Sequence, residues 1–271
     1  MKTNIQSTLL LTGKNAVLYG AAGATGSAVA RGFAREGAKV FLTGRKLDAL
    51  QALAREIIAD GGKAEAAVVD ALNESAVEEH MESVRQQAGS VDISYNAIGI
   101  PQEGIQGRPL AELPVEQFLL PVTTYARAHF LTARAAIRRM VPQKSGVILM
   151  HTPEPARIGA PLVGGMGPAW AAMEGFNRAL SAEVGAYGVR CVCLRTTGIP
   201  ETGTIDVVFG LHAKAIGIPR EEFLAMVEGM THRRKSTSLA ELASVAAFIA
   251  SDRAAAMTGT VANLTGGIIV D

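Results

Sequence analysis

Several features that mark other classes of protein are scarce in this chain of 271 residues. Its formal net charge is +1, so it has neither a basic field for nucleic acid nor an acidic tail. No apolar run is long enough to span a membrane, and the polar N-terminus lacks the apolar core of a signal peptide. These absences predict a cytoplasmic protein with neither a membrane nor a nucleic-acid partner.

Cysteine is also scarce, and the two that occur, Cys191 and Cys193, lie two residues apart in an apolar run. On a strand this spacing puts both side chains on one face, with Cβ atoms too far apart for a disulfide. No Cys/His cluster elsewhere supplies metal ligands, so we predict no metal site. We expect two buried thiols in a reducing compartment.

Aliphatic and small residues dominate, since 48% of the chain is hydrophobic but only 5% is aromatic. Short β-type runs alternate with longer helical patterns, which predicts βαβ units around a parallel sheet of about seven strands. We expect strands at 14–19, 39–43, 64–69, 91–95, 146–151, 189–194 and 260–264. We expect helices at 27–36, 47–60, 74–88, 115–140, 168–187 and 239–251. With no repeat or linker, residues 1–271 are predicted to form one domain, with a small helical substrate lobe at about 202–235.

A glycine-rich turn follows the first predicted strand, with Gly20, Gly23 and Gly26 around Thr25. Glycine allows the backbone to bend tightly and approach a pyrophosphate, while the next helix offers its free N–H groups and positive dipole end. An ordinary glycine-rich turn is the alternative. The order strand, turn and helix favours a dinucleotide site, and hence a Rossmann-type, doubly wound sheet with helices on both faces.

Residues at the ends of the next strands point to the same site. Arg45 follows the second strand, where a site selective for NAD has an acidic residue, so a 2′-phosphate and NADP(H) are predicted. A solvated surface arginine is the alternative. Asp70 follows the third strand, and Asn96 and Gly99 follow the fourth, at the sheet edge where open α/β folds bind ligands.

Together these motifs resemble those of the short-chain dehydrogenase/reductase family, classical subgroup, and the resemblance covers essentially the whole chain. The family's Thr-Gly-x-x-x-Gly-x-Gly is similar to 19–26, with the middle glycine displaced to Gly23. By resemblance, Asp70 contacts the adenine, 96–99 corresponds to Asn-Asn-Ala-Gly, and Thr202 contacts the nicotinamide amide. The resemblance also implies a homodimer or homotetramer built on helices 115–140 and 168–187.

This chain differs from the family in its catalytic groups. Members use a Tyr, a Lys four residues later, a Ser about 13 positions before the Tyr, and an Asn on the preceding helix. No Tyr-x-x-x-Lys occurs anywhere in this chain. When the two sequences are aligned, Met166, Trp170 and Pro153 fall at the Tyr, Lys and Ser positions, and Tyr125 falls near the Asn. Shifting this alignment by one residue restores only one hydroxyl group, that of Thr152.

Other side chains are candidates for the missing proton donor. Tyr125 and His129 share a helix face, although lining a helix interface is the alternative we favour. His151 and Thr152 are expected at the carboxyl edge of the sheet, where a histidine can equally be a structural hydrogen-bonding group. Glu154 is a weaker candidate that we expect to be solvated, and Pro168 is expected to begin its helix.

Three functions fit these residues. The first, which we adopt because the cofactor residues are retained, is an NADP(H)-dependent oxidoreductase acting on a small apolar carbonyl, imine or activated alkene with a non-standard proton donor. The second is an inactive dinucleotide-binding pseudoenzyme or partner subunit. The third is a non-redox cyclase, isomerase or dehydratase in which Met166, Trp170 and Met173 shape an apolar pocket.

Overall fold

A single parallel sheet organises the chain, and the computed structural model describes residues 9–270 of it. All strand pairs are parallel, in the order β3-β2-β1-β4-β5-β6-β7, so the direction of winding reverses between β1 and β4. The strands are β1 Asn15–Tyr19, β2 Lys39–Gly44, β3 Lys63–Val68, β4 Ile93–Asn96, β5 Gly146–Pro153, β6 Val189–Thr196 and β7 Val261–Leu264.

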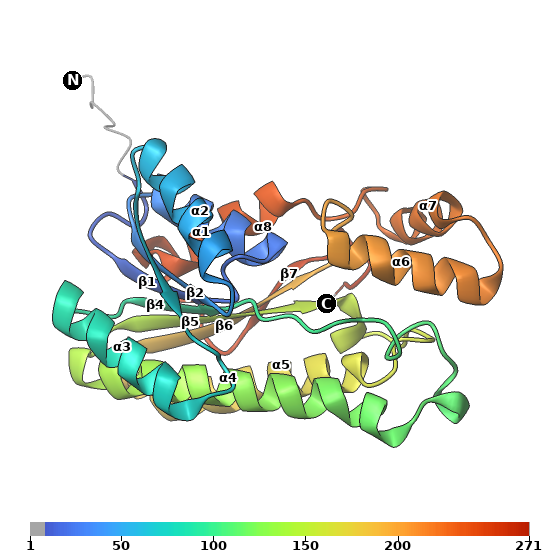
Figure 1. Cartoon of the computed structure of the whole chain (residues 1–271), viewed down its shortest axis with the longest axis horizontal. Coiled ribbons are helices and arrows are strands. Elements are labelled where there is room, and N and C mark those ends of the chain that lie inside the picture. Colours follow the sequence, from blue (N-terminus) through green and yellow to red (C-terminus); the bar gives the residue numbers. More distant parts are fainter. Residues whose placement is uncertain (1–8, 271) are drawn as a thin grey trace.

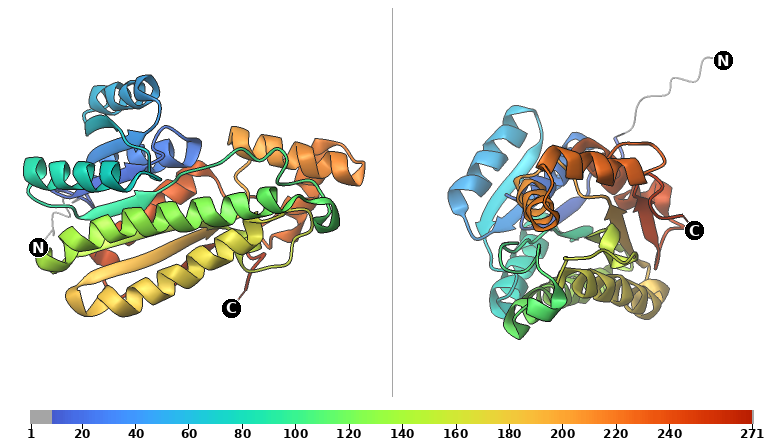
Figure 2. Two further views of the ribbon diagram at one scale, coloured as in Figure 1. Left: turned by 60° about the horizontal axis from the view of Figure 1, so that its bottom comes forward. Right: turned by 90° about the vertical axis from the view of Figure 1, so that its right-hand side faces the viewer.

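Helices cover both faces of the sheet (Figures 1 and 2). One face packs against α1, α2 and α8, and the other against α3, α4 and α5. The helices are α1 Ala24–Arg35, α2 Leu47–Ala59, α3 Glu74–Ala88, α4 Val115–Gln143, α5 Met166–Val184, α6 Gly203–Ile216, α7 Arg220–Met230 and α8 Leu239–Ala250. The predicted doubly wound Rossmann-type fold is confirmed.

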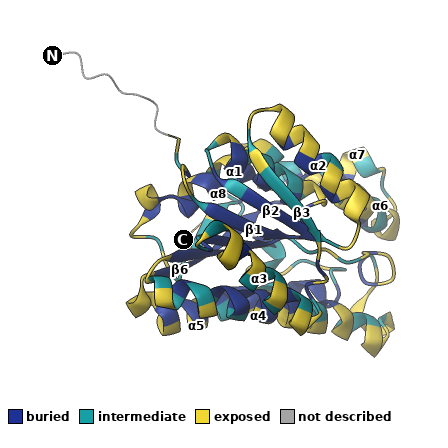
Figure 3. Cartoon of the chain, turned by 60° about the vertical axis from the view of Figure 1, so that its left-hand side comes forward, coloured by how far each residue is buried: buried dark blue, intermediate teal, exposed yellow. Residues whose placement is uncertain are grey.

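Two hydrophobic clusters, one on each side of the sheet, explain the apolar strand sequences. Along β1, Ala16 and Leu18 belong to one cluster, and Val17 and Tyr19 to the other. Side chains alternate along a strand, so a strand covered on both faces must be apolar throughout. The helices show exposed outer surfaces and buried inner ones (Figure 3). Cys191 and Cys193 are buried free thiols on β6, as predicted.

The boundaries of two helices near prolines differ from those we predicted. The α5 helix begins at Met166, so Pro168 is its third residue and not its first. The first turn of a helix needs no intrahelical N–H donors, so proline is tolerated there. Similarly, α4 continues past residue 140 to Gln143 and contains Pro142 in its last turn.

The predicted helical lobe consists of α6 and α7 and has a small hydrophobic cluster of its own. Phe209 and Phe223 meet edge to face within this cluster, with ring centroids 5.3 Å apart. The lobe lies beyond the carboxyl end of the sheet, next to the loops that follow β4, β5 and β6 (Figures 1 and 2). Among the described helices, none combines the length and apolar character needed to cross a membrane.

Candidate active site

The glycine turn between β1 and α1 has the tight geometry that a dinucleotide site requires. Gly20 has φ +68°, and a Cβ atom on it would lie 2.7 Å from the carbonyl oxygen of Ala97. A Cβ atom on Gly26 would lie 2.5 Å from the carbonyl oxygen of Gly20. Gly23 is the N-cap of α1, and no side chain caps the free N–H groups of that helix. The turn therefore leaves these donors available to an anion.

Asn96 ties the loop after β4 to α4. Its Nδ2 donates to Oγ1 of Thr132 at 3.0 Å, and its Oδ1 accepts from the backbone N–H of Ile98 at 3.1 Å. Asn96 is buried, whereas Gly99 is exposed and a Cβ atom there would meet nothing within 4 Å. Close packing requires glycine at Gly20 and Gly26, but no such contact requires it at Gly99.

Arg45 and Asp70 lie where the sequence places them, in the loops after β2 and β3. Arg45 is exposed. Asp70 is also exposed, and its Oδ1 accepts from the backbone N–H of Leu72 at 3.0 Å. Both follow strands of the same half of the sheet, so they reach its carboxyl edge beside the glycine turn.

A cavity of about 460 Å³ joins the glycine turn to the lobe. Gly23, Thr25 and Asn96 line one end of it, and residues of α6 and α7 line the other. Thr202 also faces it; this buried residue caps α6 by accepting from the N–H of Ile205 and donates to the carbonyl of Ile199 at 2.9 Å. One continuous cavity therefore connects the predicted nucleotide site with an apolar compartment.

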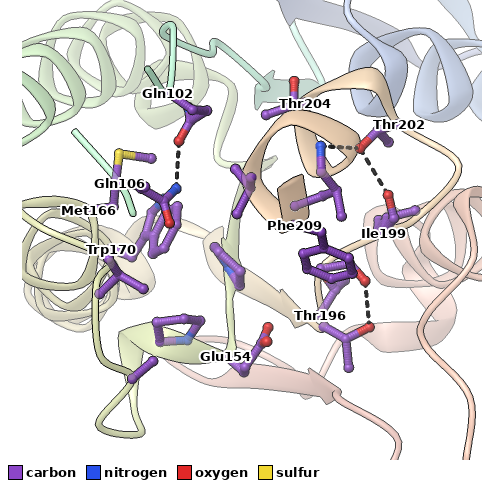
Figure 4. Close-up of a pocket in the computed structure, with 18 of the residues that line it drawn as sticks. Gln102, Gln106, Glu154, Met166, Trp170, Thr196, Ile199, Thr202, Thr204 and Phe209 are labelled. Carbon is purple, nitrogen blue, oxygen red and sulfur yellow. Dashed lines mark hydrogen bonds between the residues drawn. The ribbon is translucent and has the colours of Figure 1, made fainter. Parts of the chain in front are cut away.

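Met166 and Trp170, which the sequence alignment puts at the family's Tyr and Lys positions, line the wall of the cavity. Both come from the first turns of α5, and Met166 is fully buried. Figure 4 shows them on one side of the cavity, with Thr196, Ile199 and Phe209 on the other and Glu154 between. Met166 and Trp170 make this part of the wall apolar.

His151 and Thr152, which are adjacent on β5, point to opposite faces of the sheet. His151 faces the cavity and its Nε2 lies 2.9 Å from Oγ1 of Thr196. Thr152 does not line the cavity; its hydroxyl donates to Oε1 of Glu174 at 3.0 Å. Burial lowers the pKa of His151 to about 4, so this side chain is neutral at pH 7. Of these two candidates, only His151 is placed to meet a ligand.

Tyr125 and His129 line the cavity, although both are buried in α4. The ring centroids are 6.1 Å apart, and Nδ1 of His129 lies 3.0 Å from the carbonyl oxygen of Tyr125. Burial raises the pKa of Tyr125 to about 12 and lowers that of His129 to about 4. At neutral pH the tyrosine is therefore protonated and the histidine is uncharged.

Glu154 is only partly exposed, whereas we expected a solvated side chain. It begins the short 3₁₀ helix that follows β5, and its side chain faces the cavity. Its Oε2 is shielded from solvent and has no hydrogen-bond partner within residues 9–270. Burial raises the pKa of this carboxyl to about 7, although backbone hydrogen bonds at Glu154 and Gly198 partly oppose the shift. The cavity thus holds one carboxyl group that titrates near neutral pH.

The sheet, the glycine turn and the cavity at the carboxyl edge define a dinucleotide-binding α/β protein. The family model described as enoyl-(acyl carrier protein) reductase matches residues 20–268, and the chain belongs to the short-chain dehydrogenase/reductase family. This family uses nicotinamide dinucleotide cofactors, and the cradle formed by Gly20 and Gly26 fits a pyrophosphate.

Individual relatives cover nearly the whole chain. It is 31% identical over 273 residues to L-rhamnose 1-dehydrogenase (NAD(P)(+)) of Azotobacter vinelandii, covering 97% of this chain and 99% of the relative. It is 29% identical over 259 residues to the uncharacterized oxidoreductase YxbG of Bacillus subtilis, covering 96% and 92%. An NAD⁺-bound xylitol dehydrogenase has the same fold, with a TM-score of 0.89 at 23% identity over 95% of this chain and 99% of that one.

Proposed function

We propose that this protein is an NADP(H)-dependent oxidoreductase that acts on a small apolar carbonyl, imine or activated alkene. The observation that carries the proposal is the single cavity that runs from the glycine turn to the apolar lobe. In such a cavity a nucleotide and a small substrate can meet without intervening water.

The residues that would hold the cofactor lie along the carboxyl edge of the sheet. The N–H groups of the glycine turn would bind the pyrophosphate, Asp70 the adenine, Arg45 the 2′-phosphate and Thr202 the nicotinamide amide. The reduced nicotinamide supplies a hydride when it is bound.

Proton delivery is the step in which this site differs from its family. A positioned general acid contributes about 10²–10⁴-fold to rate, and the usual Tyr-Lys pair is replaced by Met166 and Trp170. His129 and His151 are uncharged at pH 7 and hold no acidic proton, which leaves the hydroxyl of Tyr125 and the carboxyl of Glu154. Of these two groups, we propose that Glu154 gains and loses a proton near neutral pH, because its pKa of about 7 lies nearest to that pH.

We expect Arg45→Ala to weaken NADPH binding by about 10–100-fold and to leave NADH binding within about twofold, since a hydrogen bond to a charged group contributes about 1.5–3 kcal/mol. Only NADPH carries the 2′-phosphate that Arg45 would contact. Calorimetric titration of both nucleotides measures the difference. Arg55→Ala is the matched control, because it removes an equally exposed positive charge from α2, away from the end of β2.

Equal affinity for the two nucleotides in the unmodified protein would contradict the assignment of NADP(H). Tight NADPH binding without turnover of any carbonyl, imine or alkene would instead favour the inactive pseudoenzyme. A homodimer or homotetramer through α4 and α5 is part of the proposal, because Phe130 is 48% exposed there and contacts Phe176 across the two helices. Light scattering at the mass of a monomer would contradict that part.

A further inference from the structure

We propose that the cavity is built to bind an apolar organic cation, specifically an iminium substrate and its amine product, through the carboxylate of Glu154. The assignment of iminium reduction rests on the proposed function. The binding of a cation at Glu154 stands on the charges and contacts of the cavity itself.

The cavity lining contains no group that is positively charged at pH 7 among residues 9–270. Its titratable lining groups are Glu154 on the loop after β5, His151 on β5, Tyr125 and His129 on α4, and His212 on α6. No Lys, Arg or Asp among residues 9–270 lines it. Burial lowers the pKa of all three histidines, and to about 4 for two of them, so none carries a positive charge at pH 7. An ionised Glu154 therefore has no counter-charge in the lining.

Neither Arg157 nor Arg195 supplies a counter-charge to Glu154. The nearest guanidinium in the sequence, that of Arg157, is exposed. Arg195 on β6 does not line the cavity and forms a bidentate ion pair with Glu174. Among residues 9–270, the cavity lining offers Glu154 no positive charge, so we take a ligand as its source.

The local chain leaves one oxygen of the Glu154 carboxyl without a partner among residues 9–270. Pro153 and Pro155 flank Glu154 and have no backbone N–H, so neither neighbour can donate to the carboxylate. The backbone hydrogen bonds at Glu154 and Gly198 oppose the rise of its pKa only in part. Its Oε2 is shielded and has no partner in the described part of the chain. A buried carboxylate without a counter-charge is unfavourable, whereas a cation bound beside it offsets the loss of hydration. The site is thus incomplete until a cation enters.

The rest of the cavity lining is largely apolar and includes aromatic rings. Trp170 replaces the lysine of the family and so removes the ammonium that would repel a cation. Trp170 and Phe209 lie on opposite sides of Glu154 in Figure 4, and Phe223 lines the cavity farther into the lobe. Aromatic faces attract cations, and the apolar walls suit the rest of such a ligand.

Reduction of this ligand class also requires no proton donor. Addition of a hydride to an iminium carbon forms one C–H bond, and the C=N π electrons return to nitrogen as a lone pair. The reduced nicotinamide is the electron donor and is oxidised, and no proton has to be delivered. A carbonyl, by contrast, becomes an alkoxide that an acid must protonate.

The test uses the single tryptophan of the chain, Trp170, as a reporter within the cavity. N-methyl-3,4-dihydroisoquinolinium and its neutral analogue of similar size, 1-tetralone, are titrated at pH 8 without nucleotide, by Trp170 emission and by calorimetry. We expect the cation to bind at least about tenfold more tightly, as one favourable charge interaction of about 1.4 kcal/mol implies. Glu154→Gln should abolish this preference, and Glu103→Gln, an exposed carboxyl outside the lining, should preserve it.

A second arm needs no variant. Lowering the pH from 8 to 6 should weaken binding of the cation by about tenfold and leave 1-tetralone unchanged, because a carboxyl with a pKa near 7 is mostly protonated at pH 6. Equal binding of the two probes, or a preference that persists in Glu154→Gln, would overturn the inference. Selective binding without oxidation of added NADPH would support the cation site and count against the proposed function.

Discussion

Replacing Arg195 by methionine is expected to lower the free energy of unfolding by about 3–5 kcal/mol, because it leaves a buried carboxylate without its partner. The guanidinium of Arg195 donates twice to Glu174, from Nε to Oε1 at 2.7 Å and from Nη2 to Oε2 at 2.6 Å. Both side chains are buried, with 8% and 5% of their surface exposed. The pair ties β6 to α5, the helix that carries Met166 and Trp170.

Chemical denaturation at pH 7 measures this loss of stability. Two further variants show whether it comes from the unpaired buried charge. Replacing both Arg195 and Glu174 by apolar residues should recover most of the loss, since no unpaired charge then remains. Arg138→Met, which breaks the more exposed ion pair with Glu78, should cost no more than about 1 kcal/mol. Equal losses in Arg195→Met and Arg138→Met would show that burial of the first pair has no energetic consequence.

Glu154→Gln is expected to stabilise the protein by about 2–3 kcal/mol at pH 8 and to have little effect at pH 5, since one pKa unit corresponds to about 1.4 kcal/mol. Burial raises the pKa of this carboxyl from 4.5 to about 7. Between these values the folded chain keeps the proton and the unfolded chain releases it. The unmodified protein therefore loses stability as the pH rises through that window, and glutamine removes the loss.

The comparison is made as the difference between variant and unmodified protein at each pH. The buried histidines titrate with the opposite sign, because their pKa values are lowered on folding, but they are common to both proteins and cancel. Glu103→Gln is the control, for which we expect no dependence of the difference on pH. A Glu154→Gln effect that is constant from pH 5 to pH 8 would mean that this carboxyl is not desolvated.

The sequence predicted the fold well because the signals of this fold are local. Apolar strands, amphipathic helices and the turn at Gly20 and Gly26 each carry their pattern in a few consecutive residues. The predicted start of α5 was wrong because a proline is compatible with more than one position in the first turn of a helix. Pro168 suggested the start of a helix, yet the first turn of a helix also tolerates proline at its third position.

The site was less predictable, for two different reasons. The alternation of side chains along a strand could have separated His151 from Thr152, because neighbours on β5 must face opposite ways. Glu154 could not have been assigned in this way. It lines a cavity to which α6 and α7 also contribute, and α6 begins only at Gly203. From the local sequence alone, a glutamate between two prolines is expected in a solvated loop.

In our proposal, one cavity binds both the nucleotide and the substrate. The most direct test is to titrate NADPH into the protein and to follow Trp170 emission and the heat of binding. Because Trp170 is the only tryptophan and lines this cavity, saturable NADPH binding with matching quenching of its emission is the predicted result. Gly26→Val should abolish both signals, since its Cβ would collide with the carbonyl of Gly20. Absence of saturable binding by NADPH and NADH alike would contradict the account.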